Sequence, residues 1–275
     1  KFSIYKCINC NLLITGLSQR FNSKIANKSF YNSTYLNNYL ARTDLMTGRF
    51  KKRLIDIEKI KMGGKILDIG CGPGLFLKAV DDNSKYQWDL YGIDINEHSV
   101  KIAGRMSNAK ILCSELKPKL FRENYFDCIT LFDVLEHDKN LVADLSLIKK
   151  ILKDDGLLVI QSPNNSSLMA YLAGKEWDWW SVPDHVIHFT PKTLCKVLKN
   201  SDFSIEKVFT WEPASDFVQN IRGVIKRRLT PVILVNKLIA KLSVIPLYMF
   251  WLIVSILERT INIGGLVVVY ATNSK

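Results

Sequence analysis

The sequence is poor in acidic residues, in paired cysteines and in long apolar runs. Its 275 residues carry 26 aspartates and glutamates against 38 lysines and arginines, which gives a formal net charge of +12. This excess favours an anionic partner such as a nucleic acid, a membrane surface or a phosphorylated substrate, and composition alone does not choose among the three. A hydrophobic share of 48% supports a substantial core, enough for one α/β domain with an appendage.

Neither a disulfide framework nor a secretory leader is indicated. Four of the six cysteines (Cys71, Cys113, Cys128 and Cys195) are isolated in apolar surroundings, which suits a reducing compartment such as the cytoplasm. Residues 1–6 lack an apolar core long enough for a signal peptide. The first residue is Lys rather than Met, and we expect the natural start to lie upstream.

A buried strand, a glycine turn and a helix are expected over residues 65–80. Asp68 lies near the carboxyl end of the apolar strand. The turn combines three alternating glycines with a cysteine: Gly70, Cys71, Gly72 and Gly74. Because glycine has no Cβ, a ligand can approach the backbone of such a turn closely. A dinucleotide-binding turn would need a third glycine at position 75, which is Leu75, so an NAD dehydrogenase is disfavoured.

A second strand is expected at residues 91–95, with Asp94 and Ile95 at its end. Asp94 lies about 20 residues beyond the glycine turn, the separation at which a carboxylate accepts both hydroxyls of a ribose. The alternative is that Asp94 caps a helix over residues 96–106. The motif and the spacing together favour ribose binding.

The Asp-Ile-Gly-Cys-Gly-Pro-Gly motif at residues 68–74 resembles the first motif of class I S-adenosylmethionine-dependent methyltransferases. This resemblance covers roughly residues 45–211 and the last strand. It implies that the turn, Cys71 included, packs on the methionine part of S-adenosylmethionine while Asp68 helps to hold the amino group. It also implies further cofactor contacts from Ile95, Ser114, Glu115 and Phe132.

The remaining elements predict an α/β fold. Strand patterns alternate with helical patterns, which implies parallel βαβ units and a doubly wound sheet with ligands beyond the carboxyl ends of its strands. We expect a mostly parallel, seven-stranded, Rossmann-like methyltransferase sheet. Its later strands are predicted at 110–113, 126–132, 156–161, 205–211 and 265–270. The predicted division is a partial zinc-ribbon-like connector (1–33) and a methyltransferase domain (34–275) containing a helical apolar insert (213–262).

Asp133, Glu136 and His137 form the candidate catalytic cluster. A hydroxyl that accepts a methyl group must lose a proton, to a general base or under the influence of a metal. The spacing resembles the Glu-x-x-Glu-His of ubiquinone-biosynthesis O-methyltransferases and small-RNA 2′-O-methyltransferases, in which the triad binds a divalent metal; here Asp133 replaces the first Glu. A plain strand-to-helix turn is the alternative. For His137 we favour a base or substrate contact over metal binding.

Residues after the fifth strand are candidates for the acceptor pocket. In the family this region lines that pocket, which implies substrate contacts for Trp177, His185 and His188. Either histidine could also supply a further metal ligand. The alternatives are an aromatic anchor for a loop and an ordinary buried histidine.

Cys7 and Cys10 form a single Cys-x-x-Cys pair. A structural zinc site needs four ligands, usually two such pairs. The segment is similar to the second half of the small zinc ribbon that precedes the catalytic domain in some methyltransferases, which implies half of a zinc site. Two unligated thiols are the alternative.

The predicted insert is basic and then apolar. Residues 217–257 contain no acidic side chain, and residues 242–257 carry no charge. Sixteen helical residues rise about 24 Å, short of the roughly 30 Å of a bilayer core, so a spanning helix is disfavoured. Residues 222–257 instead suit either an interfacial helix on anionic lipid or a helical pair that packs on protein.

The sequence therefore predicts methyl transfer from S-adenosylmethionine to a small-molecule or lipid-linked acceptor, on oxygen. One alternative is a methyltransferase acting on RNA or protein, favoured by the net charge, although no recognisable RNA or DNA module is present. A second alternative is a catalytically inactive, cofactor-binding interaction module.

Overall fold

A computed structural model of the chain describes residues 2–16, 40, 43–229, 249, 251–252, 255–256 and 261–273, with the side chains of 44–45 and 222–229 excepted. Most of the predicted basic apolar insert lies outside the described residues. The insert begins in the structure as helix α9 (Ala214–Leu229).

Seven strands form the central sheet, in the order β5-β4-β3-β6-β7-β10-β9. The first five are mutually parallel, and β10 is antiparallel to both β7 and β9. The strands are β3 (Gly64–Ile69), β4 (Trp88–Asp94), β5 (Lys110–Cys113), β6 (Phe126–Phe132), β7 (Leu152–Pro163), β9 (Phe203–Trp211) and β10 (Leu266–Asn273). The prediction of a mostly parallel seven-stranded sheet is confirmed.

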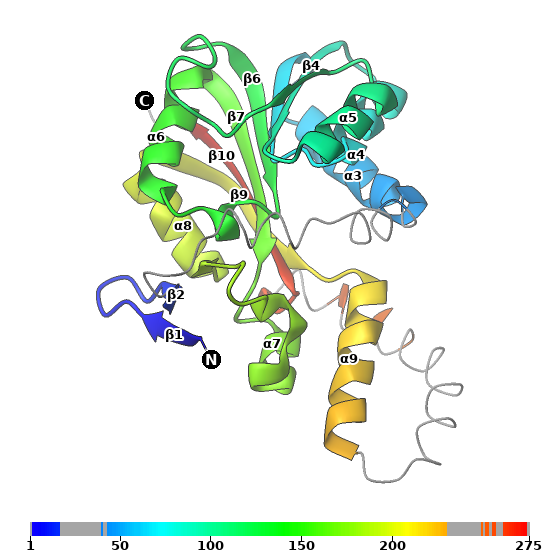
Figure 1. Ribbon diagram of the computed structural model, residues 1–275, viewed down its shortest axis with the longest axis vertical. Helices are drawn as coiled ribbons and strands as arrows, with labels where there is room; N and C mark the ends of the chain where they lie inside the picture. The colour runs from blue at the N-terminus through cyan, green and yellow to red at the C-terminus, as the bar shows by residue number, and fades with distance from the viewer. Residues whose placement is uncertain are drawn as a thin grey trace.

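Helices cover both faces of this sheet (Figure 1). One face carries α3 (Thr43–Glu58), α4 (Leu75–Asn83) and α5 (Glu97–Met106), and the other carries α6 (Leu141–Ile151) and α8 (Pro191–Asn200). Local signals set several of the helix starts. Thr190 and Thr193 form a reciprocal capping box at the start of α8, with Pro191 in its first turn.

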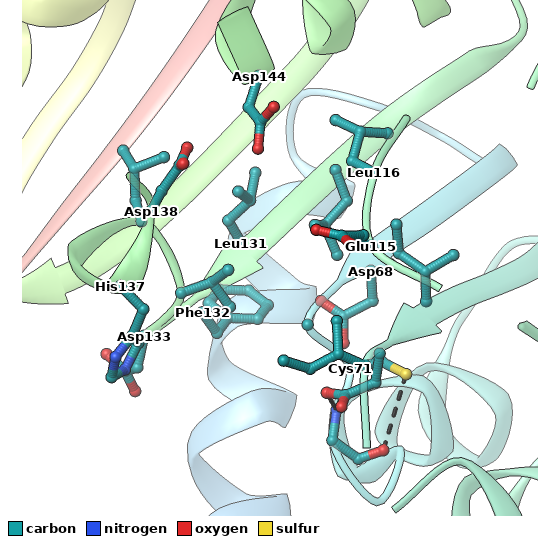
Figure 2. A pocket seen from close by; sticks show the side chains of 18 of the residues that line it. Asp68, Cys71, Glu115, Leu116, Leu131, Phe132, Asp133, His137, Asp138 and Asp144 are labelled. Atoms are coloured by element: carbon teal, nitrogen blue, oxygen red, sulfur yellow. Dashed lines mark hydrogen bonds between the residues drawn. The ribbon is translucent and has the colours of Figure 1, made fainter. Parts of the chain in front are cut away.

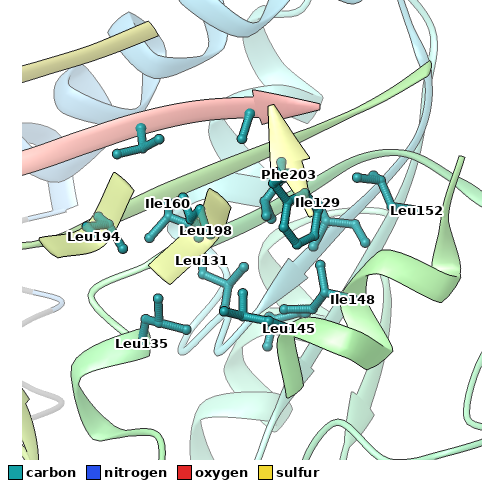
Figure 3. Close-up of a cluster of buried hydrophobic side chains, with 14 of the residues drawn as sticks. Ile129, Leu131, Leu135, Leu145, Ile148, Leu152, Ile160, Leu194, Leu198 and Phe203 are labelled. Carbon is teal, nitrogen blue, oxygen red and sulfur yellow. The ribbon is translucent and has the colours of Figure 1, made fainter. Parts of the chain in front are cut away.

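Each face has its own hydrophobic cluster, because parallel strands are apolar on both sides. On one face, α3 and α4 pack on the sheet through Leu54, Ile57 and Phe76. On the other, shown in Figure 3, Leu145 and Ile148 of α6 and Leu194 and Leu198 of α8 belong to one cluster with side chains of the strands. These two clusters fix the strand ends relative to one another, and the loops at those ends carry the site.

A separate three-stranded sheet joins the N-terminal segment to the domain. It contains β1 (Ser3–Lys6), β2 (Leu13–Gly16) and β8 (Ile187–His188), and all its pairings are antiparallel. Leu12 belongs to the cluster of α6 and α8. In Figure 1 this hairpin lies beside the end of α8, and α7 (Leu168–Ala173) and α9 project from the same end of the molecule.

Within the described residues, no helix combines the length and the hydropathy needed to cross a membrane.

Candidate functional site

The glycine turn after β3 is tight and adopts the left-handed conformation three times. The φ angles are 71° at Gly70, 51° at Gly72 and 81° at Gly74, values that favour glycine. A Cβ on Gly70 would lie 2.4 Å from Val134 Cγ2, whereas a Cβ on Gly72 would meet no atom within 4 Å. Gly70 is therefore needed for close packing, and the backbone at Gly72 faces open space.

That open space is a cavity of about 400 Å³. Residues from the ends of β3, β4, β5 and β6 line it, as expected for a parallel sheet. Figure 2 shows Asp133, His137 and Asp138 along one side and Glu115, Asp68 and Cys71 along the other. All ten residues predicted to bind the cofactor line this cavity except Gly74, whose amide bonds the Cys71 carbonyl within the turn.

Asp68 places a buried carboxyl group at the wall of the cavity. Its side chain is 3% exposed, and the Thr130 hydroxyl donates a 2.7 Å hydrogen bond to Oδ1. Burial raises the pKa of Asp68 to about 7, and the nearby Asp94 adds to the rise. A cationic amino group in the cavity would favour the ionised carboxylate, which fits the role implied for Asp68.

Asp94 supports the glycine turn from the neighbouring strand. Its Oδ2 accepts a 2.8 Å hydrogen bond from the Gly72 amide, and its Oδ1 accepts one from the Asn96 amide. Burial raises its pKa despite these bonds. The helix cap considered as an alternative is provided by Asn96, whose side chain accepts from the Ser99 amide.

The end of the cavity near β5 is acidic. Ser114 and Glu115, which follow β5, line the cavity as predicted, and the carboxylates of Asp138 and Asp144 also line it. Burial, together with the charges of Asp138 and Glu115, raises the pKa of Asp144 to about 6. Asp144 lies in α6, and its place in the cavity follows from helix packing, for which the local sequence offers no signal.

Asp133 stands where β6 ends, in a left-handed conformation with φ of 58° that is uncommon outside glycine. Both of its carboxylate oxygens accept from Gln161 Nε2, at 3.3 and 3.1 Å. The side chain is open to the cavity, yet the surrounding protein desolvates it enough to raise its pKa to about 6.

Glu136 and His137 lie in a short 3₁₀ turn (Leu135–His137); His137 lines the cavity, Glu136 is buried outside its lining, and His185 packs against His137. Glu136 is 1% exposed; Ser162 Oγ donates to its Oε2, whereas Oε1 has no partner. Burial and then the charge of Asp133 raise the pKa of Glu136 well above its usual value. Ligand atoms of Glu136, His137 and His185 lie within 4.8 Å of one another.

Each of these two imidazoles is oriented by a backbone carbonyl. His137 Nδ1 lies 3.0 Å from the Asp184 oxygen, and His185 Nδ1 lies 2.9 Å from the Trp179 oxygen. A carbonyl only accepts, so both Nδ1 atoms carry the proton and Nε2 keeps its lone pair. Burial lowers both pKa values, that of His185 to about 3. Both rings are therefore neutral at physiological pH.

Three other sequence candidates are absent from the lining of this cavity. Trp177 is buried in a cluster with α7 and α9. His188 is buried beside Trp180, where burial lowers its pKa to about 4 and its Nε2 bonds Thr15 Oγ1 at 2.8 Å. His185 lies beside His137, with its ring 4.7 Å from that imidazole.

Cys7 and Cys10 lie in the turn of the N-terminal hairpin. Hydrogen bonds from the Cys10 and Asn9 backbone lower the pKa of the Cys7 thiol. Within the described part of the chain, no third ligand joins these two thiols.

Comparison with known proteins agrees with this geometry. A family model described as a methyltransferase domain matches residues 39–208, more than half of the chain. The chain belongs to this methyltransferase family. It is a class I, S-adenosylmethionine-dependent member, as the glycine-turn motif predicted, and its sheet has the mostly parallel, seven-stranded form expected of the fold.

Relatives of this methyltransferase differ in their acceptors. It is 35% identical over 112 residues to 24-methylenesterol C-methyltransferase 3 of Arabidopsis thaliana, covering 38% of this chain and 31% of that protein. It is 26% identical over 162 residues to a ubiquinone biosynthesis O-methyltransferase of Glaesserella parasuis, covering 53% and 67%. The chain spans less than half the length of the first curated relatives it matches, between 31% and 47%.

The fold is shared with solved methyltransferase structures. A crystal structure of an S-adenosylmethionine-dependent methyltransferase from Archaeoglobus fulgidus superposes with a TM-score of 0.57 at 21% identity, covering 88% of this chain and all of that one. This likeness concerns the fold alone.

Proposed function

We propose that this methyltransferase moves a methyl group from S-adenosylmethionine to an oxygen atom of a small-molecule or lipid-linked acceptor. The supporting observation is one cavity whose wall combines the glycine turn, two strand-end carboxylates and the Asp133–His137 segment. The cofactor supplies an activated methyl group on a sulfonium. The protein's contribution is to hold both partners, exclude water and take up the acceptor's proton.

The residues present fit S-adenosylmethionine. A methionine part would lie on the backbone at Gly72, where a Cβ would project into open space. Asp68 would hold the amino group through its buried carboxylate, and Asp94 would accept the ribose hydroxyls. Ser114 and Glu115, with Asp144 beside them, offer hydrogen-bonding groups to the adenine edge. Ile95 and Phe132 supply apolar walls.

Two groups on the cavity wall can accept a proton from an acceptor hydroxyl. His137 is neutral and lines the cavity, but its Nδ1 is engaged by a carbonyl, so only Nε2 is available. Asp133 is open to the cavity and anchored by Gln161. The two side chains lie on the same side of the cavity (Figure 2), so both belong to the proposed catalytic set, together with the buried Glu136 next to His137 in the chain.

Transfer of labelled methyl groups tests the proposal. The purified protein is incubated with methyl-labelled S-adenosylmethionine and a fractionated cell extract, and label in the small-molecule or lipid fraction is the expected result. Label in RNA or protein would instead favour the macromolecular acceptors that the net charge of +12 allows. Absence of label in any fraction, with tight binding of S-adenosylhomocysteine, would favour an inactive binding module.

We also propose a divalent metal site at Glu136, His137 and His185. Two imidazoles and one carboxylate suit Zn²⁺ or Fe²⁺, and the carbonyls that hold both Nδ1 protons resemble the partners that orient metal-bound histidines. The unpartnered, buried Oε1 of Glu136 supports it. Such a metal would occupy His137 Nε2, which would leave Asp133 as the proton acceptor, and it would favour ionisation of a nearby hydroxyl.

Titration calorimetry with Zn²⁺ tests the metal site. The protein carries Cys7→Ser and Cys10→Ser, so that the thiol pair of the N-terminal hairpin cannot bind zinc. We expect one binding event that disappears in His185→Ala and persists in His98→Ala, which changes an exposed histidine on α5. Equal binding by both variants would contradict the assignment. In the native background, a second event that needs Cys7 and Cys10 would support the proposed half zinc site.

Residues 222–257 are proposed to contact anionic lipid. The support is compositional, because basic residues adjoin an uncharged apolar stretch. Flotation with anionic liposomes should fall when residues 232–257 are deleted, and unchanged flotation would contradict the proposal.

A further inference from the structure

A second cavity lies beside the first and shares a wall with it. Its volume is about 360 Å³, and Phe50 and Asp133 line both cavities. The rest of its wall combines aromatic, charged and amide side chains, among them Arg49, Arg53, Gln161, Trp179, Trp211 and Asp216. A group bound in either cavity would therefore border Asp133.

The carboxylate of Asp133 is held in a fixed orientation by a chain of hydrogen bonds. Gln161 Oε1 accepts from Arg53 Nε at 3.3 Å and Nη2 at 3.2 Å, and from Trp211 Nε1 at 3.3 Å. These three donors determine which end of the amide is oxygen, so Nε2 must face Asp133, to which it donates. Arg53 and Gln161 are both buried, so the chain is rigid.

The charges in the wall of this second cavity are largely matched. Arg49 forms a 3.2 Å ion pair with Asp216 and also bonds Ser215. Arg53 stacks on the Trp211 ring, 4.5 Å from its centroid, and is linked to Asp133 through Gln161. The further carboxylate in the wall, Asp178, is exposed to solvent. Among the described residues, an anionic ligand would find no free cation deep in this cavity, because Arg49 and Arg53 are already engaged, so an uncharged acceptor is favoured over an anionic one.

We propose that the second cavity is the methyl-acceptor site, and that it takes an uncharged, planar, hydroxyl-bearing molecule of one or two aromatic rings. Phe50, Trp179 and Trp211 provide apolar ring surfaces, and a volume of about 360 Å³ suits a small ligand. Asp133 accepts the hydroxyl proton. Gln161 and Arg53 are positioning residues that aim its carboxylate.

The proposed step balances without any further reactant. The acceptor O–H bond breaks and its proton passes to the Asp133 carboxylate. The oxygen then forms a bond to the methyl carbon, and the carbon–sulfur bond of the cofactor breaks with its electron pair left on sulfur, which becomes a neutral thioether. This inference rests on the proposed function, because it requires a methyl donor in the first cavity.

Binding of four matched probes tests the acceptor class. Calorimetry with protein saturated with S-adenosylhomocysteine compares 2-naphthol with 2-naphthoate, 2-naphthylmethylamine and the saturated decahydro-2-naphthol. We expect 2-naphthol to bind about tenfold tighter than each of the others. Equal or tighter binding of any of the three overturns the assignment. Failure to bind S-adenosylhomocysteine would instead overturn the proposed function, so the two failures are distinct.

Variants locate the bound probe. Trp179→Leu should weaken 2-naphthol binding by about fivefold or more. Trp88→Phe, which changes an indole on β4 outside both cavities, should leave it unchanged. Equal effects of the two variants would overturn the location.

The roles of Asp133 and Gln161 are tested by comparing the effects of their substitution on kcat and on KM. Formation of 2-methoxynaphthalene is the readout. Asp133→Asn should lower kcat about 100-fold or more while the KM for 2-naphthol changes little. Gln161→Leu should also lower kcat more than it raises KM. A proportional change in KM, or no turnover of bound 2-naphthol by the wild-type protein, would overturn the assignment.

Discussion

Replacing Asp68 with Asn should stabilise the cofactor-free protein while weakening cofactor binding. Burial raises the pKa of Asp68 from an ordinary value of 3.8 to about 7. The folded protein therefore holds this proton more tightly than the unfolded chain. Its stability falls as pH rises from near 4 to near 7, and remains lowered above that range.

The size of this effect follows from the shift. Each pKa unit corresponds to about 1.36 kcal/mol, so the ionised carboxylate costs the folded state about 4 kcal/mol at pH 8. The Thr130 hydroxyl can still donate to an Asn oxygen, but burial of the new amide group costs about 1–3 kcal/mol. We expect Asp68→Asn to be about 1–3 kcal/mol more stable at pH 8, a rise of about 2–6 °C in Tm.

Differential scanning calorimetry of both proteins at pH 8 and pH 5 measures this difference. At pH 5 the carboxyl group of Asp68 is protonated in the folded protein. The difference in free energy of unfolding between Asp68→Asn and the wild type should therefore shrink by about 3 kcal/mol. Asp89→Asn, at an exposed carboxylate on β4, should change Tm by less than about 1 °C. The reasoning would be refuted if the stability gained by Asp68→Asn did not depend on pH, or if this variant were less stable than the wild type at pH 8.

The same variant tests the binding role of Asp68. Calorimetry with S-adenosylhomocysteine should show affinity at least about tenfold weaker at pH 8, because a charge-assisted hydrogen bond is lost. A more stable protein with weaker binding would identify Asp68 as a site where stability is given up for function. Undiminished affinity would contradict the role implied for it.

Two other substitutions have clear expected outcomes. Gly70→Ala should weaken S-adenosylhomocysteine binding about tenfold or more in calorimetry, because its Cβ would lie 2.4 Å from Val134 in a left-handed backbone. In the control Gly104→Ala, the new Cβ on α5 would meet nothing within 4 Å. This control should leave the affinity unchanged and the protein equally or more stable. Thr15→Val should lower the free energy of unfolding by about 1–3 kcal/mol in urea titrations, because it leaves the buried His188 Nε2 unpaired; unchanged stability would contradict this.

The sequence by itself predicted the features that depend on local pattern. The strands at Lys110–Cys113 and Phe126–Phe132 have the predicted bounds, because apolar runs between polar turns mark buried strands. The glycine turn and the acids at the ends of β3 and β4 were found by spacing. Parallel strands then bring their ends to one edge, so Asp68 and Asp94 line one cavity.

Local pattern was less reliable at the boundary between α6 and β7. The sequence predicted a strand over residues 156–161, because Asp154, Asp155 and Gly156 have the composition of a turn. In the structure β7 begins at Leu152, where the chain pairs with Phe126 of β6. Pairing with a neighbouring strand overrode the turn composition at this place.

Only the tertiary structure decided which polar side chains meet. Arg53, Gln161 and Asp133 come from α3, β7 and the end of β6, and sequence gives no signal that one amide joins them. His185 reaches Glu136 because the segment before β8 folds back over the 3₁₀ turn, and Thr15 of the hairpin holds that segment. Periodicity within an element is set by neighbours a few residues apart, whereas these contacts depend on how distant elements pack.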